Sequence, residues 1–253
     1  MRLAHDVYGP AEAPVVVLLG SLGTTTALWR PQVEGLSGSR RLVLLDLPGH
    51  GRSTQRHGSF GVADIANDVL ETVDSLGVTR FSFVGLSIGG MVGQSLAVLA
   101  PGRLDRLAVL FSAAAVPQPQ GFRDRAAEVR RSGGVAYLVP TLLKRWFTAD
   151  YRATHPGEIQ RVARMVEGIP AEGYAGCAEA LADADLRPDL PKISAPTLVV
   201  GGAQDQALPP ECSLEIARGI GSARHVELDP GAHLGNIERA ETVNATLKNF
   251  LAQ

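Results

Sequence analysis

The chain has 253 residues, of which 45% are hydrophobic and 20% charged, and its formal net charge is −2. This composition is typical of a globular protein with one large core. The nearly neutral charge gives no electrostatic reason to expect nucleic acid binding. No apolar run approaches the roughly 20 residues that cross a bilayer.

The N-terminal residues and the cysteines bear on where the protein is located. The N-terminal MRLAHDVYGP lacks the apolar stretch of a signal peptide. The only cysteines, Cys177 and Cys212, show no metal-ligand or CxxC spacing. Low cysteine usage is typical of a reducing compartment. We therefore expect a soluble cytoplasmic protein with no nucleic acid or membrane partner.

Short apolar runs recur along the chain and predict buried strands. They cover Val15–Leu19, Leu42–Leu45, Phe81–Val84, Leu107–Phe111 and Thr197–Val200. Runs that are apolar on both faces are typical of parallel strands covered on both sides by helices.

Segments with apolar residues at helical spacing lie between these runs. The clearest is Ala63–Leu76, which is followed by Gly77, a residue type that often follows a helix C-terminus. We also expect helices over Ser87–Leu99 and Val243–Leu251. Strands that alternate with helices predict an α/β fold with a doubly wound, mostly parallel sheet.

The alternation stops between about Ala113 and Pro191. This stretch is helix-like, is interrupted by glycine and proline, and contains no strand run. We therefore expect the core to consist of residues 1–112 and 192–253, with residues 113–191 inserted as a helical cap.

The first chemical motif is GLSIG at residues 85–89, which follows the apolar run Phe81–Val84 and opens a predicted helix. This is G-x-S-x-G in the strand–turn–helix context of a nucleophile elbow. Gly85 and Gly89 leave room for a strained turn that presents the Ser87 hydroxyl. The alternative, a surface serine in a glycine-rich turn, is disfavoured by the position after the third clear strand. We identify Ser87 as the candidate nucleophile.

A serine nucleophile needs a histidine base and an acid that orients it. In a fold of this kind, the acid follows the serine along the chain, and the histidine follows the acid. Asp205 lies just after the strand Thr197–Val200, and His233 lies just after a further probable strand that ends at Leu228. Asp229 is a rival acid, but it shares a short loop with His233 and precedes Pro230, which is typical of a turn residue.

Five other histidines compete with His233. His5 and His155 have the context of surface positions, His225 falls within a strand run, His57 is on a polar loop, and His50 lies in the PGHGRS turn, where a structural hydrogen-bonding role is common. His233 stands out because its place in the strand order is the one that the mechanism needs.

An oxyanion hole in such a site uses two backbone N–H groups. One belongs to the residue after the nucleophile, Ile88. The second comes from the loop after the first strong strand, Gly20 to Gly23, where we choose Leu22.

At this point the chain resembles the 3-oxoadipate enol-lactonases, a family of α/β hydrolases. The resemblance is carried by GSLGTT at residues 20–25 with Trp29 following, GLSIGGMVG at 85–93, RWFT at 145–148, EGYAGC at 172–177 continuing to DADLR at 183–187, and HLGNIE at 233–238. It spans nearly the whole chain. The elbow and histidine motifs occur in many α/β hydrolases, whereas the SLGTT and GYAGC segments are more discriminating.

Three departures from the family pattern bear on substrate specificity rather than on hydrolysis. Gly20 stands where the family usually has asparagine, and Gly235 replaces a serine beside the histidine. Leu47 and Pro48 replace the usual threonine and arginine, so a cation is missing near the site entrance.

The resemblance implies hydrolysis of 3-oxoadipate enol-lactone in aromatic-compound degradation, with Ser87, His233 and Asp205 as the triad and no cofactor or metal. The expected partner is a small anionic lactone or ester. Its carboxylate needs a cationic or hydrogen-bonding residue. The resemblance points to Ser21, Arg145 and Trp146 as substrate contacts.

Two of these expectations have a plainer alternative. Trp146 is either a pocket wall or part of the cap core. Residues 113–165 hold nine Arg or Lys against four Asp or Glu. This basic stretch predicts either an anion site or simply solvated helix faces, and the second is the commoner case.

Three rival functions remain open from the sequence. A general carboxylesterase or perhydrolase shares the triad but has a different pocket. A C–C bond hydrolase shares the fold and triad as well. A ligand-binding protein that has lost catalysis is disfavoured by the complete set of Ser87, Asp205 and His233.

Overall fold

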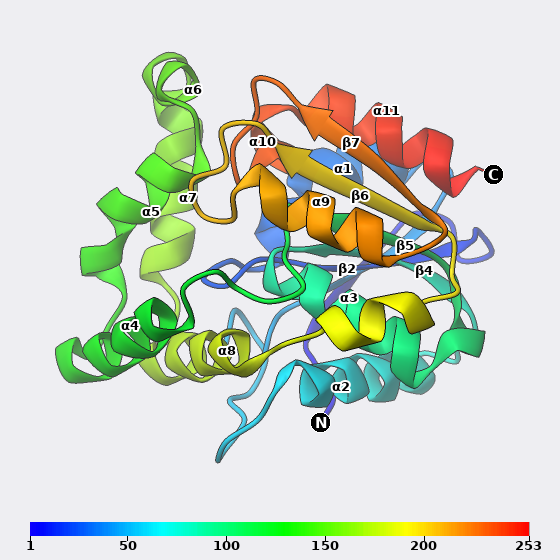
Figure 1. Ribbon diagram of the computed structural model, residues 1–253, viewed down its shortest axis with the longest axis horizontal. Coiled ribbons are helices and arrows are strands. Elements are labelled where there is room, and N and C mark those ends of the chain that lie inside the picture. Colours follow the sequence, from blue (N-terminus) through cyan, green and yellow to red (C-terminus); the bar gives the residue numbers. More distant parts are fainter. Residues whose placement is uncertain (253) are drawn as a thin grey trace.

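A seven-stranded sheet forms the centre of the computed structural model, which describes residues 1–252 (Figure 1). The strands are β1 (His5–Tyr8), β2 (Val15–Leu19), β3 (Arg41–Leu45), β4 (Phe81–Leu86), β5 (Leu104–Leu110), β6 (Thr197–Gly202) and β7 (Ala223–Leu228). Their spatial order is β1-β3-β2-β4-β5-β6-β7. The pairs from β3 to β7 are parallel, and β1 pairs antiparallel with β3.

All five predicted strands are confirmed, and the probable strand before His233 is β7. The central strands β2, β4 and β6 are almost wholly buried, which is why their sequences are continuous apolar runs rather than alternating ones. The prediction missed β1, whose four residues HDVY are exposed or half-buried at the sheet edge and carry no apolar run. The predicted fold class, a doubly wound and mostly parallel α/β sheet, is confirmed.

Helices cover both faces of this sheet (Figure 1). Those of the core are α1 (Arg30–Leu36), α2 (Val62–Ser75), α3 (Ile88–Leu99), α9 (Pro210–Gly219), α10 (Gly235–Glu238) and α11 (Ala240–Leu251). Helix α2 packs against α3 on one face, and α1 packs against α11 on the other. The predicted helices over 63–76, 87–99 and 243–251 correspond to α2, α3 and α11.

Five helices lie between β5 and β6, to one side of the sheet (Figure 1). They are α4 (Pro119–Ser132), α5 (Val139–Trp146), α6 (Ala149–Thr154), α7 (Pro156–Glu167) and α8 (Ala171–Asp183). Helix α4 packs along α8, and α5 packs on α7. The two ends of this segment meet, because Leu186 N–H donates to the Ala114 carbonyl over 2.9 Å and Ala115 pairs with Asp185.

Short 3-10 helices complete the described secondary structure: η1 (Thr26–Trp29), η2 (Pro101–Arg103), η3 (Ala136–Leu138) and η4 (Arg187–Lys192). Among residues 1–252, no helix combines the length and the apolar character that crossing a membrane requires.

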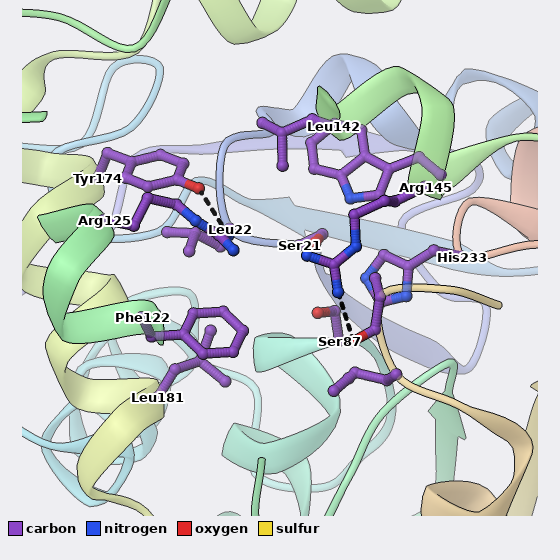
Figure 2. A pocket seen from close by; sticks show the side chains of 13 residues that line it. Ser21, Leu22, Ser87, Phe122, Arg125, Leu142, Arg145, Tyr174, Leu181 and His233 are labelled. Atoms are coloured by element: carbon purple, nitrogen blue, oxygen red, sulfur yellow. Dashed lines mark hydrogen bonds between the residues drawn. The ribbon is translucent and has the colours of Figure 1, made fainter. Parts of the chain in front are cut away.

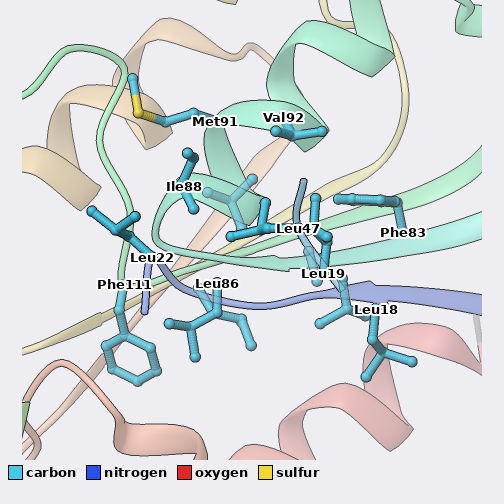
Figure 3. Packing of buried hydrophobic residues seen from close by; sticks show 14 of the residues in the cluster. Leu18, Leu19, Leu22, Leu47, Phe83, Leu86, Ile88, Met91, Val92 and Phe111 are labelled. Atoms are coloured by element: carbon cyan, nitrogen blue, oxygen red, sulfur yellow. The ribbon is translucent and has the colours of Figure 1, made fainter. Parts of the chain in front are cut away.

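The hydrophobic core surrounds the central strands and extends into the junction of β4 and α3 (Figure 3). Leu19, Leu86 and Ile88 are fully buried there. Each buried aliphatic side chain of this size contributes roughly 1.5–3 kcal/mol by leaving water. The junction that carries Ser87 is therefore set in rigid, close-packed surroundings rather than on a mobile loop.

Candidate active site

Ser87 occupies the sharp turn between β4 and α3 with φ 58° and ψ −118°. A positive φ is unfavourable for a residue with a Cβ atom. Two hydrogen bonds hold the serine backbone there. Its N–H donates to the Leu110 carbonyl over 2.9 Å, and the Ser112 hydroxyl donates to the Ser87 carbonyl over 2.7 Å. The last residue of β5 and the segment that follows this strand thus maintain the strained conformation of the turn.

Gly85 and Gly89 are required by close backbone approach, as expected for this motif. A Cβ atom on Gly85 would lie 2.1 Å from the Gly89 carbonyl oxygen. One on Gly89 would lie 2.1 Å from the carbonyl oxygen of Leu19, the last residue of β2. The turn therefore fits between β2 and α3 only because both side chains are absent.

His233 and Asp205 form a buried pair at the ends of neighbouring strands. His233 Nδ1 lies 2.8 Å from Asp205 Oδ2, and both side chains are almost inaccessible to solvent. The other carboxylate oxygen, Oδ1, accepts the backbone N–H groups of Ala207 at 2.7 Å and Leu208 at 2.9 Å. These two bonds fix the carboxylate, so that Oδ2 remains directed at the imidazole.

Ser87 and His233 line the same pocket, which lies between the sheet and the cap (Figure 2). The Trp146 ring stacks on that of His233, with the centroids 6.5 Å apart and the planes at 28°. Leu234 N–H also donates to the Trp146 carbonyl over 3.0 Å. Trp146 is therefore both a buried residue of the cap core and a wall of the pocket.

The structure places the competing residues elsewhere. Within residues 1–252, no hydrogen bond joins Asp229 to His233, and Asp205 takes that position. His225 pairs with Ser213 at 2.9 Å, away from the pocket. His50 is fully buried and hydrogen-bonded to backbone on both ring nitrogens.

Leu22 and Ile88, the expected oxyanion donors, both lie next to the serine. Leu22 lines the pocket, and Ile88 is the first residue of α3. The first N–H groups of a helix have no intrahelical partner. Within residues 1–252, the N–H of Leu22 has no hydrogen-bond acceptor either. Two free backbone donors therefore stand beside Ser87.

The remaining lining of the pocket comes largely from the cap (Figure 2). Ser21 and Arg145, which the sequence indicated, are both present. The sequence reasoning missed Phe122, Arg125, Leu142, Tyr174, Leu181, Ala207 and Leu208. Tyr174 lies in the GYAGC segment that carries part of the family resemblance. Arg125 is marked in the sequence only by the basic composition of residues 113–165.

Two arginines, Arg125 on α4 and Arg145 on α5, reach this pocket without a carboxylate partner among residues 1–252. Arg125 Nη1 donates to the Tyr174 hydroxyl over 3.3 Å. Arg145 donates through Nε and Nη2 to the Gln206 carbonyl, at 3.0 and 2.7 Å. Burial, and then the charge of Arg125, lowers the pKa of Arg145. Two half-buried cations near each other favour an anion between them.

Two of the three departures from the family pattern, the two glycines, have a local explanation. A Cβ atom on Gly235 would lie 2.3 Å from Phe111, whose ring occupies the space of the usual serine side chain. A side chain on Gly20 would meet Thr24 Oγ1 at 2.7 Å. At the third departure, the Pro48 carbonyl accepts a hydrogen bond from His50 and one from Cys177.

No group of three or more His, Cys, Asp or Glu side chains among residues 1–252 is arranged to hold a metal ion. Cys177 and Cys212 are buried free thiols, and burial raises the pKa of Cys212 to about 11.

The chain is similar over most of its length to proteins named as hydrolases. A family model for the alpha/beta hydrolase fold matches residues 14–240. The chain is 32% identical to 3-oxoadipate enol-lactonase 2 of Acinetobacter baylyi, covering 99% of this chain and 94% of that protein. It is 33% identical to a RutD protein of Agrobacterium fabrum, provisionally named a carbamate hydrolase, covering 97% of each. The crystal structure of the enol-lactonase from Burkholderia xenovorans LB400 matches with a TM-score of 0.95 at 38% identity, covering 99% and 96%.

These similarities extend over almost the full length of each protein, so they include the cap as well as the sheet. The resemblance to the 3-oxoadipate enol-lactonases is thereby confirmed. The chain belongs to the α/β-hydrolase family and is a hydrolase.

Proposed function

We propose that this hydrolase opens the lactone ring of 3-oxoadipate enol-lactone to give 3-oxoadipate, a step in aromatic-compound degradation. The observation that carries the proposal is a pair of arginines, Arg125 and Arg145, that have no carboxylate partner among residues 1–252 and line the pocket that also holds Ser87 and His233. A small ester that carries its own carboxylate complements this pocket. The enol-lactonase relatives support the same substrate class.

In the proposed mechanism, His233 Nε2 takes the proton of Ser87 as the hydroxyl attacks the lactone carbonyl. The Asp205 carboxylate holds the imidazole through Nδ1 and stabilises the imidazolium. The negative charge that develops on the carbonyl oxygen is received by the N–H groups of Leu22 and Ile88. Such donors contribute about 3 kcal/mol each to transition-state stabilisation.

Collapse of the tetrahedral intermediate breaks the ring C–O bond. The ring oxygen takes the proton from His233 and becomes an enol, which relaxes to the ketone at the far end of the same acyl chain, and this chain stays bound to Ser87. Water then attacks the acyl-enzyme, His233 accepts its proton, and the second collapse returns that proton to Ser87. The step needs no metal or organic cofactor. The product is a dicarboxylate, free of the enzyme.

The cap supplies recognition in this account. The substrate carboxylate lies between Arg125 and Arg145, and its binding offsets the cost of keeping two cations half-buried. Trp146 packs against the lactone ring, and Ser21 borders it from the core side. The apolar walls Phe122, Leu142 and Leu181 exclude water around the reacting carbonyl.

The two cysteines bear on where the enzyme is located. We assign the enzyme to the cytoplasm, because buried free thiols at Cys177 and Cys212 fit a reducing compartment.

A second candidate, hydrolysis of neutral esters or carbamates by the same serine, is favoured by the RutD relative. It gives the two arginines no ligand.

The test is loss of the ultraviolet absorbance of fresh enol-lactone on addition of the purified enzyme, with Ser87→Ala as the control. We expect kcat/KM for the enol-lactone to exceed that for a neutral aryl ester or an aryl carbamate by orders of magnitude. Equal or higher kcat/KM for the neutral substrates would contradict the proposal.

A further inference from the structure

The loop after β2 holds one of the two proposed oxyanion donors, and both peptide planes around that donor are fixed by side chains. On the N-terminal side, the Ser21 carbonyl accepts the Thr24 N–H at 3.1 Å and the Thr24 hydroxyl at 2.7 Å. The C=O and N–H of a trans peptide point in opposite directions. The Leu22 N–H therefore points away from Thr24.

On the C-terminal side, the Leu22–Gly23 peptide is fixed by a buried histidine. Gly23 N–H donates to His50 Nε2 over 3.1 Å. Gly23 has φ +82°, and a Cβ atom there would lie 3.3 Å from the Tyr174 ring. The loop is thus set between the pocket wall on one side and His50 on the other.

The hydrogen bonds assign the tautomer of His50. Because Nε2 accepts from Gly23, the ring proton is on Nδ1, which donates to the Pro48 carbonyl over 3.0 Å. Burial lowers the pKa of His50 to about 4. The ring is therefore neutral near pH 7, and its Nε2 lone pair is available as an acceptor.

The turn that carries His50 is itself anchored to the cap. The backbones of Gly49 and Gly173 are in close contact, since a Cβ atom on Gly49 would lie 2.4 Å from Gly173 Cα. Asp46 braces the β2 loop a second time, because its Oδ1 accepts the Thr26 N–H over 2.8 Å. His50 thus connects a rigid turn to the residue that follows Leu22.

We propose that His50 is a positioning residue, which keeps the Leu22 N–H directed at the substrate carbonyl oxygen by holding Gly23 through an acceptor nitrogen. This inference rests on the proposed acyl transfer at Ser87. It assigns His50 no contact with substrate and no proton transfer.

The test measures how strongly the enzyme prefers an oxygen ester over its thiono analogue. Sulfur accepts hydrogen bonds poorly, so this preference reports the alignment of the oxyanion donors, and a general loss of folded enzyme cancels in the ratio. The substrates are 4-nitrophenyl acetate and O-(4-nitrophenyl) thionoacetate rather than the enol-lactone. A failure of the lactone proposal therefore appears in a different assay from a failure of this one.

His50→Phe keeps a buried ring but removes the acceptor. We expect kcat for the oxygen ester to fall about 10- to 100-fold, KM to stay within about twofold, and the oxygen preference to fall about tenfold. His50→Gln places an amide oxygen near Gly23 and is expected to recover most of the preference. His50→Met, a more adaptable side chain without an acceptor, replaces His50→Phe if the latter does not fold.

The matched control is His225→Phe, which changes a histidine that contacts Ser213 outside the pocket. It should retain the wild-type preference. The proposal is overturned if His50→Phe or His50→Met keeps the wild-type oxygen preference, or if His50→Gln loses as much of it as they do.

Discussion

Asp205 divides its two carboxylate oxygens between two tasks, because Oδ1 accepts backbone N–H groups from Ala207 and Leu208 while Oδ2 lies 2.8 Å from His233 Nδ1. In Asp205→Asn, the single amide oxygen satisfies the backbone donors and the NH₂ group faces the imidazole. His233 Nδ1 must then be an acceptor, which places the ring proton on Nε2, where the Ser87 proton has to go.

We therefore expect Asp205→Asn to fold normally and to lose about 10⁴-fold in kcat. The measurement is kcat on an aryl ester, with the melting temperature as a check on the fold. A loss of less than tenfold in a folded variant would mean that Asp205 does not set the tautomer of His233.

The two pocket arginines are expected to differ in their kinetic effect. Arg125→Met removes a charge that contacts only cap residues, so KM for the enol-lactone should rise about 10- to 100-fold with little change in kcat. Arg145→Met also frees the Gln206 carbonyl next to Asp205, so both KM and kcat should change.

The matched control for this pair is Arg123→Met, since Arg123 lies on the same helix α4 and is exposed in an ion pair with Asp183. Its KM should stay within about twofold of the wild type. Neutral aryl esters should be turned over with an unchanged KM by Arg125→Met. A parallel loss on neutral and anionic substrates would argue against carboxylate recognition by Arg125.

The close packing of the nucleophile elbow predicts that an alanine substitution costs much more stability at Gly89 than at Gly121, although both glycines lie in helices. Gly89→Ala places a methyl group 2.1 Å from the Leu19 carbonyl oxygen, so the free energy of unfolding should fall by about 3 kcal/mol. Gly121→Ala in α4 meets nothing within 4 Å, and its stability should be unchanged or raised by up to about 1 kcal/mol. Urea denaturation of both variants measures this, and equal stabilities would contradict the geometry of the elbow.

Buried His50 predicts a specific loss of stability in acid. Its pKa is about 4 in the fold and 6.5 when exposed, so between these values the unfolded chain binds more protons and stability rises with pH. The stability that His50 contributes is complete above pH 6.5 and falls by about 3 kcal/mol as the pH drops toward 4. The glutamine of His50→Gln takes up no proton in this pH range, so the variant lacks this loss of stability.

The measurement for this prediction is the free energy of unfolding at pH 7 and at pH 4.5 for the wild type and for His50→Gln. The wild type should lose more stability on acidification than the variant does. Identical losses would show that His50 does not titrate in this range.

The central sheet and the Ser87 turn could be predicted because short stretches of sequence determine them. Continuous apolar runs identify buried parallel strands, and Gly85 and Gly89 identify the strained turn within five residues. β1 could not be predicted in this way, since an exposed four-residue edge strand needs no apolar run.

The substrate side of the site depends on contacts that sequence spacing does not encode. Arg125 differs from Arg123 only in which face of α4 it occupies, and the packing of α4 on α8 decides that. His50 was expected to have a structural hydrogen-bonding role, but its partner, Gly23, lies 27 residues away on another loop. That Gly23 is the partner of His50 is evident only from the folded chain.

The most direct test of the account is covalent labelling of the nucleophile. The wild-type enzyme is treated with a fluorophosphonate, and the modified peptide is identified by mass spectrometry. We predict one label per chain, on Ser87, with no labelling of Ser87→Ala and full labelling of Ser213→Ala, which removes a serine that is hydrogen-bonded to a histidine outside the pocket. A label on any other serine, or no label on folded wild-type enzyme, would contradict the assignment of Ser87 as the nucleophile.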